Sequence, residues 1–316
     1  MREELLRLLG DFPKRPPSAE VRVIAEDELD DHIRQLVRYE AEEGETINAY
    51  LLRPKTGKSD SAAPRPGILA IHPHAGEFAY GKSEVVGLRQ DKRTSHYGLE
   101  LVKRGFVVLA PDLLGFEERR PSATEAERNY SLEGFHYERM IYFDRLLTGS
   151  TLQAKYLSDL AAALDVLEGL PDVDGGRLGT IGHSLGGQEA LWLAMYDGRV
   201  RAAVCSCGVS TYRSVMEDRY IHNFPFYVPN LLASGDMDDF LTDVAPRGLF
   251  ISAGVRDLSF PVRGAMAIDR ALSATYEKLG AAERYRFVAF DGGHDFPDSI
   301  KSQAYDWLEQ ELNART

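Results

Sequence analysis

A serine lies between glycines in the segment Gly182-His-Ser184-Leu-Gly186. Residues 177–181 before it are predicted to form a strand, and residues 185–196 after it have the length and apolar composition of a helix. Glycines two residues before and two residues after the serine permit a tight turn that thrusts its side chain outward. The helix N-terminus behind the serine favours developing negative charge. We therefore interpret Ser184 as a catalytic nucleophile.

A serine hydroxyl is a weak nucleophile and needs a histidine base that an acid holds in place. After Ser184 the sequence contains only His222 and His294. His294 directly follows a predicted strand at residues 284–290, whereas His222 lies in a segment rich in aromatic residues. Because the base should stand at a strand end beside the nucleophile, His294 is the predicted base.

The acid is predicted to be Asp257, in the loop that follows a predicted strand at residues 248–252. The carboxyl ends of parallel strands meet at one edge of a sheet, so this loop is expected beside the other two residues. Other carboxylates are less well placed, because they precede that strand or are near neighbours of His294 in the sequence. These are Asp236, Asp238, Asp239, Asp243, Asp291 and Asp295.

The elements that position these residues alternate between strand and helix. Three short β-prone segments come first, at residues 20–25, 33–39 and 46–52, and helical and β-prone segments then follow one another to the end of the chain. This alternation predicts βαβ units and an α/β fold with a mostly parallel sheet and helices on both faces. The initial strands are expected to form an antiparallel edge.

One sheet that spans the chain accounts for the 316 residues better than two domains do, so we expect a single domain over residues 1–316. Residues 1–18 are expected to form a helical N-terminal extension, because the first ten residues alternate charge with leucine. Two segments have no place in the sheet, residues 116–150 and 209–240. We predict that both are lid insertions above the site.

The composition excludes several classes of function. A net charge of −12 disfavours a nucleic-acid partner. No apolar run approaches the roughly 18 residues of a membrane span, so no membrane association is expected. The start lacks the apolar core of a signal peptide, which favours a cytoplasmic protein. Cys205 and Cys207 are expected to be buried thiols without a metal or redox role, and the oligomeric state stays open.

The nucleophile, acid and base, in this order, resemble those of the α/β-hydrolase superfamily over about residues 20–312. Two segments, residues 105–119 and 171–184, are similar to dienelactone-hydrolase-like and acetyl-xylan-esterase-like members. The resemblance implies a mostly parallel, eight-stranded sheet with lid insertions. Dienelactone hydrolases proper use cysteine as the nucleophile, so Ser184 favours an ordinary ester over a lactone.

Residues 71–78 read Ile-His-Pro-His-Ala-Gly-Glu-Phe and resemble the His-Gly-Gly turn of related esterases, which carries one oxyanion-hole amide. The resemblance implies that the backbone N–H of Leu185, together with that of Ala75 or Gly76, binds the oxyanion. Candidate pocket residues flank the turn and the nucleophile or lie in the aromatic second insertion. They are His74, Phe78, His183, Phe224, Phe226 and Tyr227.

These expectations describe a serine carboxylesterase that cleaves small acyl or acetyl esters through an acyl-enzyme, with no metal and no organic cofactor. A peptidase or acyl-aminoacyl hydrolase of the prolyl-oligopeptidase type would use the same three residues. The sequence has no repeat of the length of a propeller blade, which favours the ester. A non-catalytic binding protein on the same fold is the third alternative.

Overall fold

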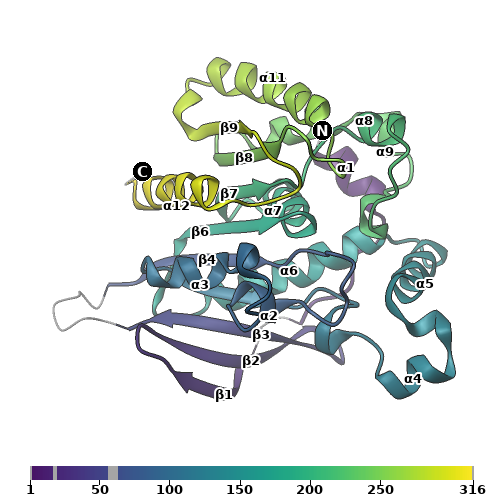
Figure 1. Cartoon of the computed structure of the whole chain (residues 1–316), viewed down its shortest axis with the longest axis vertical. Helices are drawn as coiled ribbons and strands as arrows, with labels where there is room; N and C mark the ends of the chain where they lie inside the picture. Colours follow the sequence, from purple (N-terminus) through teal and green to yellow (C-terminus); the bar gives the residue numbers. More distant parts are fainter. Residues whose placement is uncertain (1, 17–19, 56–62, 315–316) are drawn as a thin grey trace.

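The computed structural model describes residues 2–16, 20–55 and 63–314. Within this part of the chain, nine strands form one mixed sheet in the order β1-β2-β3-β5-β4-β6-β7-β8-β9 (Figure 1). The strands are β1 (Arg22–Glu28), β2 (His32–Glu42), β3 (Glu45–Pro54), β4 (Arg65–Ile71), β5 (Val107–Pro111), β6 (Val173–His183), β7 (Val200–Ser206), β8 (Gly248–Gly254) and β9 (Tyr285–Phe290).

The sheet confirms the mostly parallel α/β architecture but has one strand more than the expected eight. Strands β4 to β9 run parallel to one another, and β1, β2 and β3 form an antiparallel run that joins them through the β3–β5 pair. Every residue of β1 is exposed. The additional edge strand is therefore held by its backbone ladder with β2 and not by burial of its side chains.

Helices cover both faces of the sheet. The α-helices are α1 (Arg2–Leu9), α2 (Lys82–Val85), α3 (Tyr97–Lys103), α4 (Ala123–Arg128), α5 (Gly134–Leu147), α6 (Leu152–Glu168), α7 (Leu185–Tyr196), α8 (Tyr212–Glu217), α9 (Leu231–Ser234), α10 (Met237–Phe240), α11 (Val262–Lys278) and α12 (Asp298–Asn313). Short 3-10 helices are η1 (Arg93–Ser95), η2 (Glu117–Arg119), η3 (Tyr130–Leu132), η4 (Phe224–Phe226), η5 (Leu241–Val244) and η6 (Ala282–Arg284).

The two faces have separate hydrophobic cores. In β4, Ile68 and Ala70 pack into the core with α3 and α12, whereas Leu69 and Ile71 pack into the core with α6, α7 and α11. Successive side chains of a strand point to opposite faces, so a strand buried on both sides must be apolar throughout. This is why the central strands read as continuous apolar runs.

The N-terminal extension is only partly helical. Helix α1 ends at Leu9, and Leu5 and Leu9 are buried against the body of the protein. Residues 10–16 continue without a helix, and residues 1, 17 and 18 of the expected extension lie outside the described residues. None of the described helices combines the length and apolarity that a membrane crossing needs.

The two predicted insertions fold into short helices beside one end of the sheet. Residues 116–150 contain α4 and α5, and residues 209–240 contain α8, α9 and α10, on the right-hand side of Figure 1. The insertions touch each other, since the rings of Tyr142 and Phe224 lie 5.4 Å apart. Their action as lids stays a prediction.

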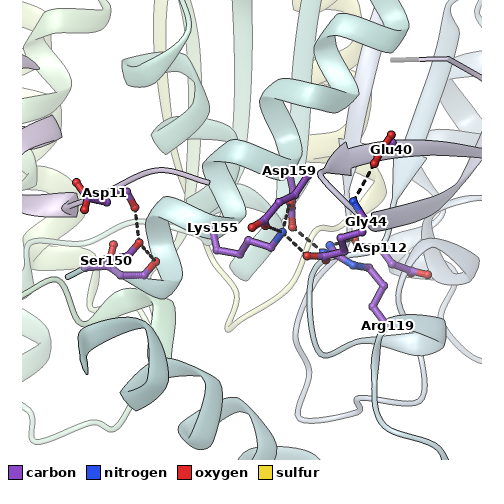
Figure 2. A network of polar contacts seen from close by, with 11 residues as sticks. Asp11, Glu40, Gly44, Asp112, Arg119, Ser150, Lys155 and Asp159 are labelled. Carbon is purple, nitrogen blue, oxygen red and sulfur yellow. Dashed lines mark hydrogen bonds and ion pairs between the residues drawn. The ribbon is translucent and has the colours of Figure 1, made fainter. Parts of the chain in front are cut away.

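A buried network of charges ties the first insertion and α6 to the antiparallel edge. Figure 2 shows Lys155 and Arg119 converging on Asp159. The Lys155 Nζ atom lies 2.9 Å from Asp159 Oδ1 and 2.6 Å from Glu45 Oε2, and Arg119 pairs with the same two carboxylates. Because α6, η2 and β3 contribute one charge or more each, the network fixes how these elements meet.

Candidate active site

Ser184 stands on a sharp turn between β6 and α7. Its backbone is left-handed, with φ 57° and ψ −123°, a conformation that costs a non-glycine residue on the order of 1–3 kcal/mol. A Cβ atom on Gly182 would lie 2.1 Å from the carbonyl carbon of Gly186, and one on Gly186 would lie 2.0 Å from the carbonyl oxygen of Ile71. The glycine spacing of the motif is therefore a steric requirement, and the second contact presses the end of β4 against the start of α7.

Three predicted residues form one hydrogen-bonded chain. His294 Nε2 lies 2.8 Å from Ser184 Oγ, and His294 Nδ1 lies 2.8 Å from Asp257 Oδ2. Since the carboxylate accepts from Nδ1–H, the neutral imidazole leaves Nε2 free to accept the serine proton. This is the arrangement that a nucleophile and its base require.

Asp257 is held as a carboxylate although its side chain is 1% exposed. Its other oxygen accepts the backbone N–H groups of Ser259 at 2.8 Å and Phe260 at 3.0 Å. Burial alone would raise the pKa of Asp257, but the hydrogen bond and charge of His294 and these two N–H groups lower it below its ordinary value. The acid is thus ionised and aimed at the imidazole.

The loops after β8 and β9 meet at the same sheet edge, as the parallel topology requires. A Cβ atom on Gly254 would lie 2.0 Å from the carbonyl oxygen of Gly293, and the Arg256 N–H donates to the Gly292 carbonyl at 2.8 Å. This close backbone approach brings Asp257 and His294 within reach of each other.

The alternative acids and base have other partners. Asp291 is exposed and pairs with Arg256, and Asp236 accepts the N–H groups of Tyr212 and Met237. The His222 Nε2 atom lies 2.7 Å from the Ser259 carbonyl oxygen. Burial lowers the pKa of His222 to about 4, so it stays neutral in the wall of the second insertion.

The candidate oxyanion donors differ in what they already bind. The Leu185 N–H is in the first turn of α7, where a helix offers no internal acceptor. The Gly76 N–H donates to His74 Nδ1 at 3.0 Å, whereas the Ala75 N–H has no hydrogen-bond acceptor among the described residues. The geometry therefore favours Ala75 as the second donor.

The turn that carries Ala75 is strained. Ala75 has φ 50°, Gly76 has φ 71°, and the Glu77 N–H donates to the His74 carbonyl at 3.1 Å, which defines a type I′ turn. Alanine in the left-handed region costs on the order of 1–2 kcal/mol. The surroundings must hold this turn in place.

Several candidate pocket residues lie in packed surroundings. Phe78 is 8% exposed and stacks on Phe116, with ring centroids 5.0 Å apart. Phe226 is 2% exposed and stacks on Tyr212 at 3.9 Å. Phe224 and Tyr227 are half-buried. Contact of any of these side chains with substrate stays a prediction.

The two histidines next to the site are both buried. His183 lies with its ring centroid 4.9 Å from that of His294 and its Nδ1 atom 3.3 Å from Ser206 Oγ. Burial and the neighbouring His294 lower the pKa of His183 to about 3, which fits a neutral packing role. His74 precedes Ala75 on the strained turn of residues 74–77 and contacts Glu138 of α5.

Sequence reasoning missed three neighbours of the site. The Phe260 ring stacks on His294 at 5.9 Å, and Phe135 stacks on His74 at 5.2 Å. Cys207 approaches Asp257 and His294, with potential ligand atoms within 4.8 Å of one another. Burial raises the pKa of the Cys207 thiol to about 12, so a neutral thiol lies beside Asp257 and His294. No local pattern in the sequence marks these contacts.

A small cavity lies behind the nucleophile. Its volume is about 10 Å³, enough for about one water molecule. It extends from Gly208 to side chains of the second insertion, residues 209–240. A Cβ atom on Gly208 would lie 2.6 Å from the Ser184 carbonyl oxygen, so the cavity begins directly behind the turn. Aromatic and aliphatic side chains line most of it, namely Leu191, Trp192, Tyr212, Phe226, Met237 and Phe260.

Helix α7 carries a buried carboxyl group, Glu189. It accepts hydrogen bonds from the side-chain amides of Gln153 at 2.6 Å and Gln188 at 3.1 Å, and it has no cationic partner among the described residues. Burial raises the pKa of Glu189 to about 8 against the opposite effect of both amides. The group is therefore protonated in the folded protein at neutral pH.

We expect Glu189→Gln to stabilise the protein at pH 8 and to change little at pH 5. The pKa of this carboxyl group is about 4.5 in the unfolded chain and about 8 in the folded protein. Between these two pH values the unfolded chain releases the proton more readily, so the protein loses stability as the pH rises. Glutamine has a similar shape to the protonated carboxyl group but cannot release a proton, so it does not lose stability in this way. Melting temperatures of the variant and of the exposed control Glu283→Gln should differ by several degrees at pH 8 only. A pH-independent difference would contradict the neutral carboxyl.

Comparisons with known proteins agree with this fold. The model of the "Dienelactone hydrolase family" matches residues 60–275, a range that includes Ser184 and Asp257 and ends before His294. A protein of Bacillus subtilis (strain 168), "Putative hydrolase YtaP", is 31% identical over 313 residues, 98% of each chain.

Solved structures are similar at lower identity. A glucuronoyl esterase from Solibacter usitatus superposes with a TM-score of 0.68 at 16% identity, covering 98% of this chain and 92% of that one. Acetyl Xylan Esterase 1 from Thermoanaerobacterium sp. JW/SL YS485 gives a TM-score of 0.62 at 18% identity over 99% of both chains. At such identities the likeness concerns the fold, which is of the α/β-hydrolase type. From the family match and the full-length relative, the chain belongs to the dienelactone hydrolase family and is a hydrolase.

Proposed function

We propose that this protein is a serine carboxylesterase that cleaves small acyl esters through a covalent acyl-enzyme. The observation that carries the proposal is the hydrogen-bonded chain from Ser184 through His294 to Asp257, with the serine on a strained turn at the start of α7. Membership of a hydrolase family supports the same reaction type.

The reaction begins when Ser184 Oγ attacks the ester carbonyl while His294 Nε2 takes its proton. Asp257 keeps the imidazole in the tautomer that can accept this proton and stabilises the resulting cation. The N–H groups of Leu185 and Ala75 bind the oxyanion of the tetrahedral intermediate, and one such donor lowers the barrier by roughly 3–4 kcal/mol.

The intermediate then collapses, and the alcohol leaves with the proton from His294. Water enters, gives a proton to His294 and attacks the acyl-enzyme by the same path. The second tetrahedral intermediate releases the carboxylic acid and returns the proton to Ser184 Oγ. Atoms of the chain and of water supply every proton in this cycle.

The proposed acyl groups are short. Acetyl xylan esterases are among the structural neighbours, which supports an acetyl ester as the first substrate to try.

The proposal is tested with p-nitrophenyl acetate, butyrate and octanoate beside alanine p-nitroanilide as the amide. We expect a burst followed by turnover on acetate, weaker turnover on butyrate, and none on octanoate or on the amide. Amide turnover that exceeds ester turnover would replace the proposal with a peptidase. No turnover of any of these substrates, together with no labelling of Ser184 by a fluorophosphonate, would favour a non-catalytic binding protein.

A further inference from the structure

A buried carboxylate from the first insertion contacts the strained turn of residues 74–77, which carries the proposed second oxyanion donor. Helix α5 is mostly exposed, and its buried residues are Glu138 and Ile141. The Glu138 side chain is 1% exposed, and both of its oxygens lie 3.3 Å from His74 Nε2. It has no other hydrogen-bond or ion-pair partner in the described part of the chain. Burying a charged group costs free energy, and an apolar side chain at this position would stabilise the packing of α5 more. Stability alone therefore does not explain a carboxylate here.

Hydrogen bonding defines which nitrogen of His74 carries the proton. The Gly76 N–H donates to Nδ1, so Nδ1 is the unprotonated nitrogen of the neutral ring. Nε2 then carries the hydrogen and donates it to Glu138. The carboxylate thus selects the tautomer that can accept the Gly76 N–H.

The ring of His74 is also fixed in place by aromatic neighbours. Phe135 of α5 stacks on it at 5.2 Å, and Phe78 and Phe116 meet it edge-on at 4.9 Å and 5.0 Å. The ring therefore connects the insertion to the strained turn through packing as well as through hydrogen bonds.

We propose that Glu138 is a positioning residue for the oxyanion site. Through His74 it holds the Gly76 N–H away from the reacting atoms and leaves the Ala75 N–H as the second donor beside Leu185. The turn follows β4, whose end contacts the start of α7 at Gly186, so it lies beside the nucleophile. This role rests on the proposed esterase function, because it serves the same tetrahedral intermediate.

The test compares Glu138→Gln with Glu138→Leu on p-nitrophenyl acetate. Glutamine offers an oxygen that accepts the Nε2–H, so we expect kcat within about threefold of the wild type. Leucine offers none, so we expect kcat to fall roughly tenfold to a hundredfold, less than the 10²–10³-fold effect of deleting an oxyanion donor. KM is expected to stay within about twofold. The exposed control Glu127→Leu should leave both constants unchanged.

The double variant His74→Phe/Glu138→Leu separates positioning from stability. It replaces a buried polar pair with apolar side chains of similar shape, which often preserves or raises stability. We expect a melting temperature at or above that of the wild type, together with the same loss of kcat. The affinity for a trifluoromethyl ketone, which forms an oxyanion on Ser184, should fall by the same factor as kcat.

The inference is overturned if Glu138→Leu and the double variant keep full kcat, or if they raise KM and leave ketone affinity unchanged. A melting temperature that falls in step with kcat in the double variant would assign Glu138 a structural role only. Failure of the proposed function looks different, since the wild type itself would then show no ester burst and no fluorophosphonate labelling.

Discussion

Ser184→Ala is expected to abolish ester turnover, with kcat reduced about 10⁵- to 10⁶-fold. The variant removes the hydroxyl group that lies 2.8 Å from His294 Nε2 and stands on the strained turn after β6. Alanine fits the left-handed backbone about as well as serine does, so the melting temperature should move little. Burst kinetics on p-nitrophenyl acetate measure the loss, and intact mass after fluorophosphonate treatment measures labelling.

The matched control is Ser299→Ala, which removes an exposed hydroxyl from α12. It should retain wild-type turnover and labelling. Residual turnover in Ser184→Ala above about one per cent of the wild type, with label on another residue, would contradict Ser184 as the nucleophile. Loss of activity together with a loss of folded structure would require the comparison to be repeated with Ser184→Gly, for which we expect the same loss.

Lys155→Met is expected to lower the free energy of unfolding by about 3–5 kcal/mol. The Lys155 side chain is fully buried on α6 and pairs with Asp159, Glu45 and Glu42 at 2.6–2.9 Å. Burial alone would lower the pKa of Lys155, but the carboxylates raise it above its ordinary value, so the ammonium is charged. Methionine fills similar space without the charge, and Arg119 then pairs with Asp159 and Glu45 while Glu42 loses its partner Lys155.

Denaturation in guanidinium chloride, followed by circular dichroism, measures this loss. Lys278→Met, at an exposed position near the end of α11, should stay within about 0.5 kcal/mol of the wild type. Adding Asp159→Asn to Lys155→Met removes one of the buried negative charges that then exceed the positive charge of Arg119, and should recover part of the loss. A change below about 1 kcal/mol in the single variant would mean that Arg119 alone neutralises the network shown in Figure 2.

Local chemistry explains what could be predicted. The glycine spacing around Ser184 follows from backbone contacts within a few residues, so the sequence indicates the turn directly. His294 and Asp257 follow predicted strands, and the rule that parallel strands end at one edge places them near Ser184. The alternation of apolar strands and helices likewise determined the α/β class. The expected eight strands came from the family resemblance, whereas the sequence itself indicated a β-prone segment at residues 20–25, which overlaps the edge strand β1.

Contacts between distant segments were decided by the tertiary structure alone. His74 and Glu138 are 64 residues apart, and neither stands in a motif that marks the other. The preference for Ala75 over Gly76 depends on which N–H the His74 ring accepts, a matter of side-chain geometry within one turn. Lys155 and Glu42 are 113 residues apart. The sequence alone does not reveal whether a charged side chain will be exposed to water or paired with a buried carboxylate. The sequence could indicate the cluster of Ser184, Asp257 and His294 because its geometry is local or set by strand order, whereas packing decided which groups hold it in place.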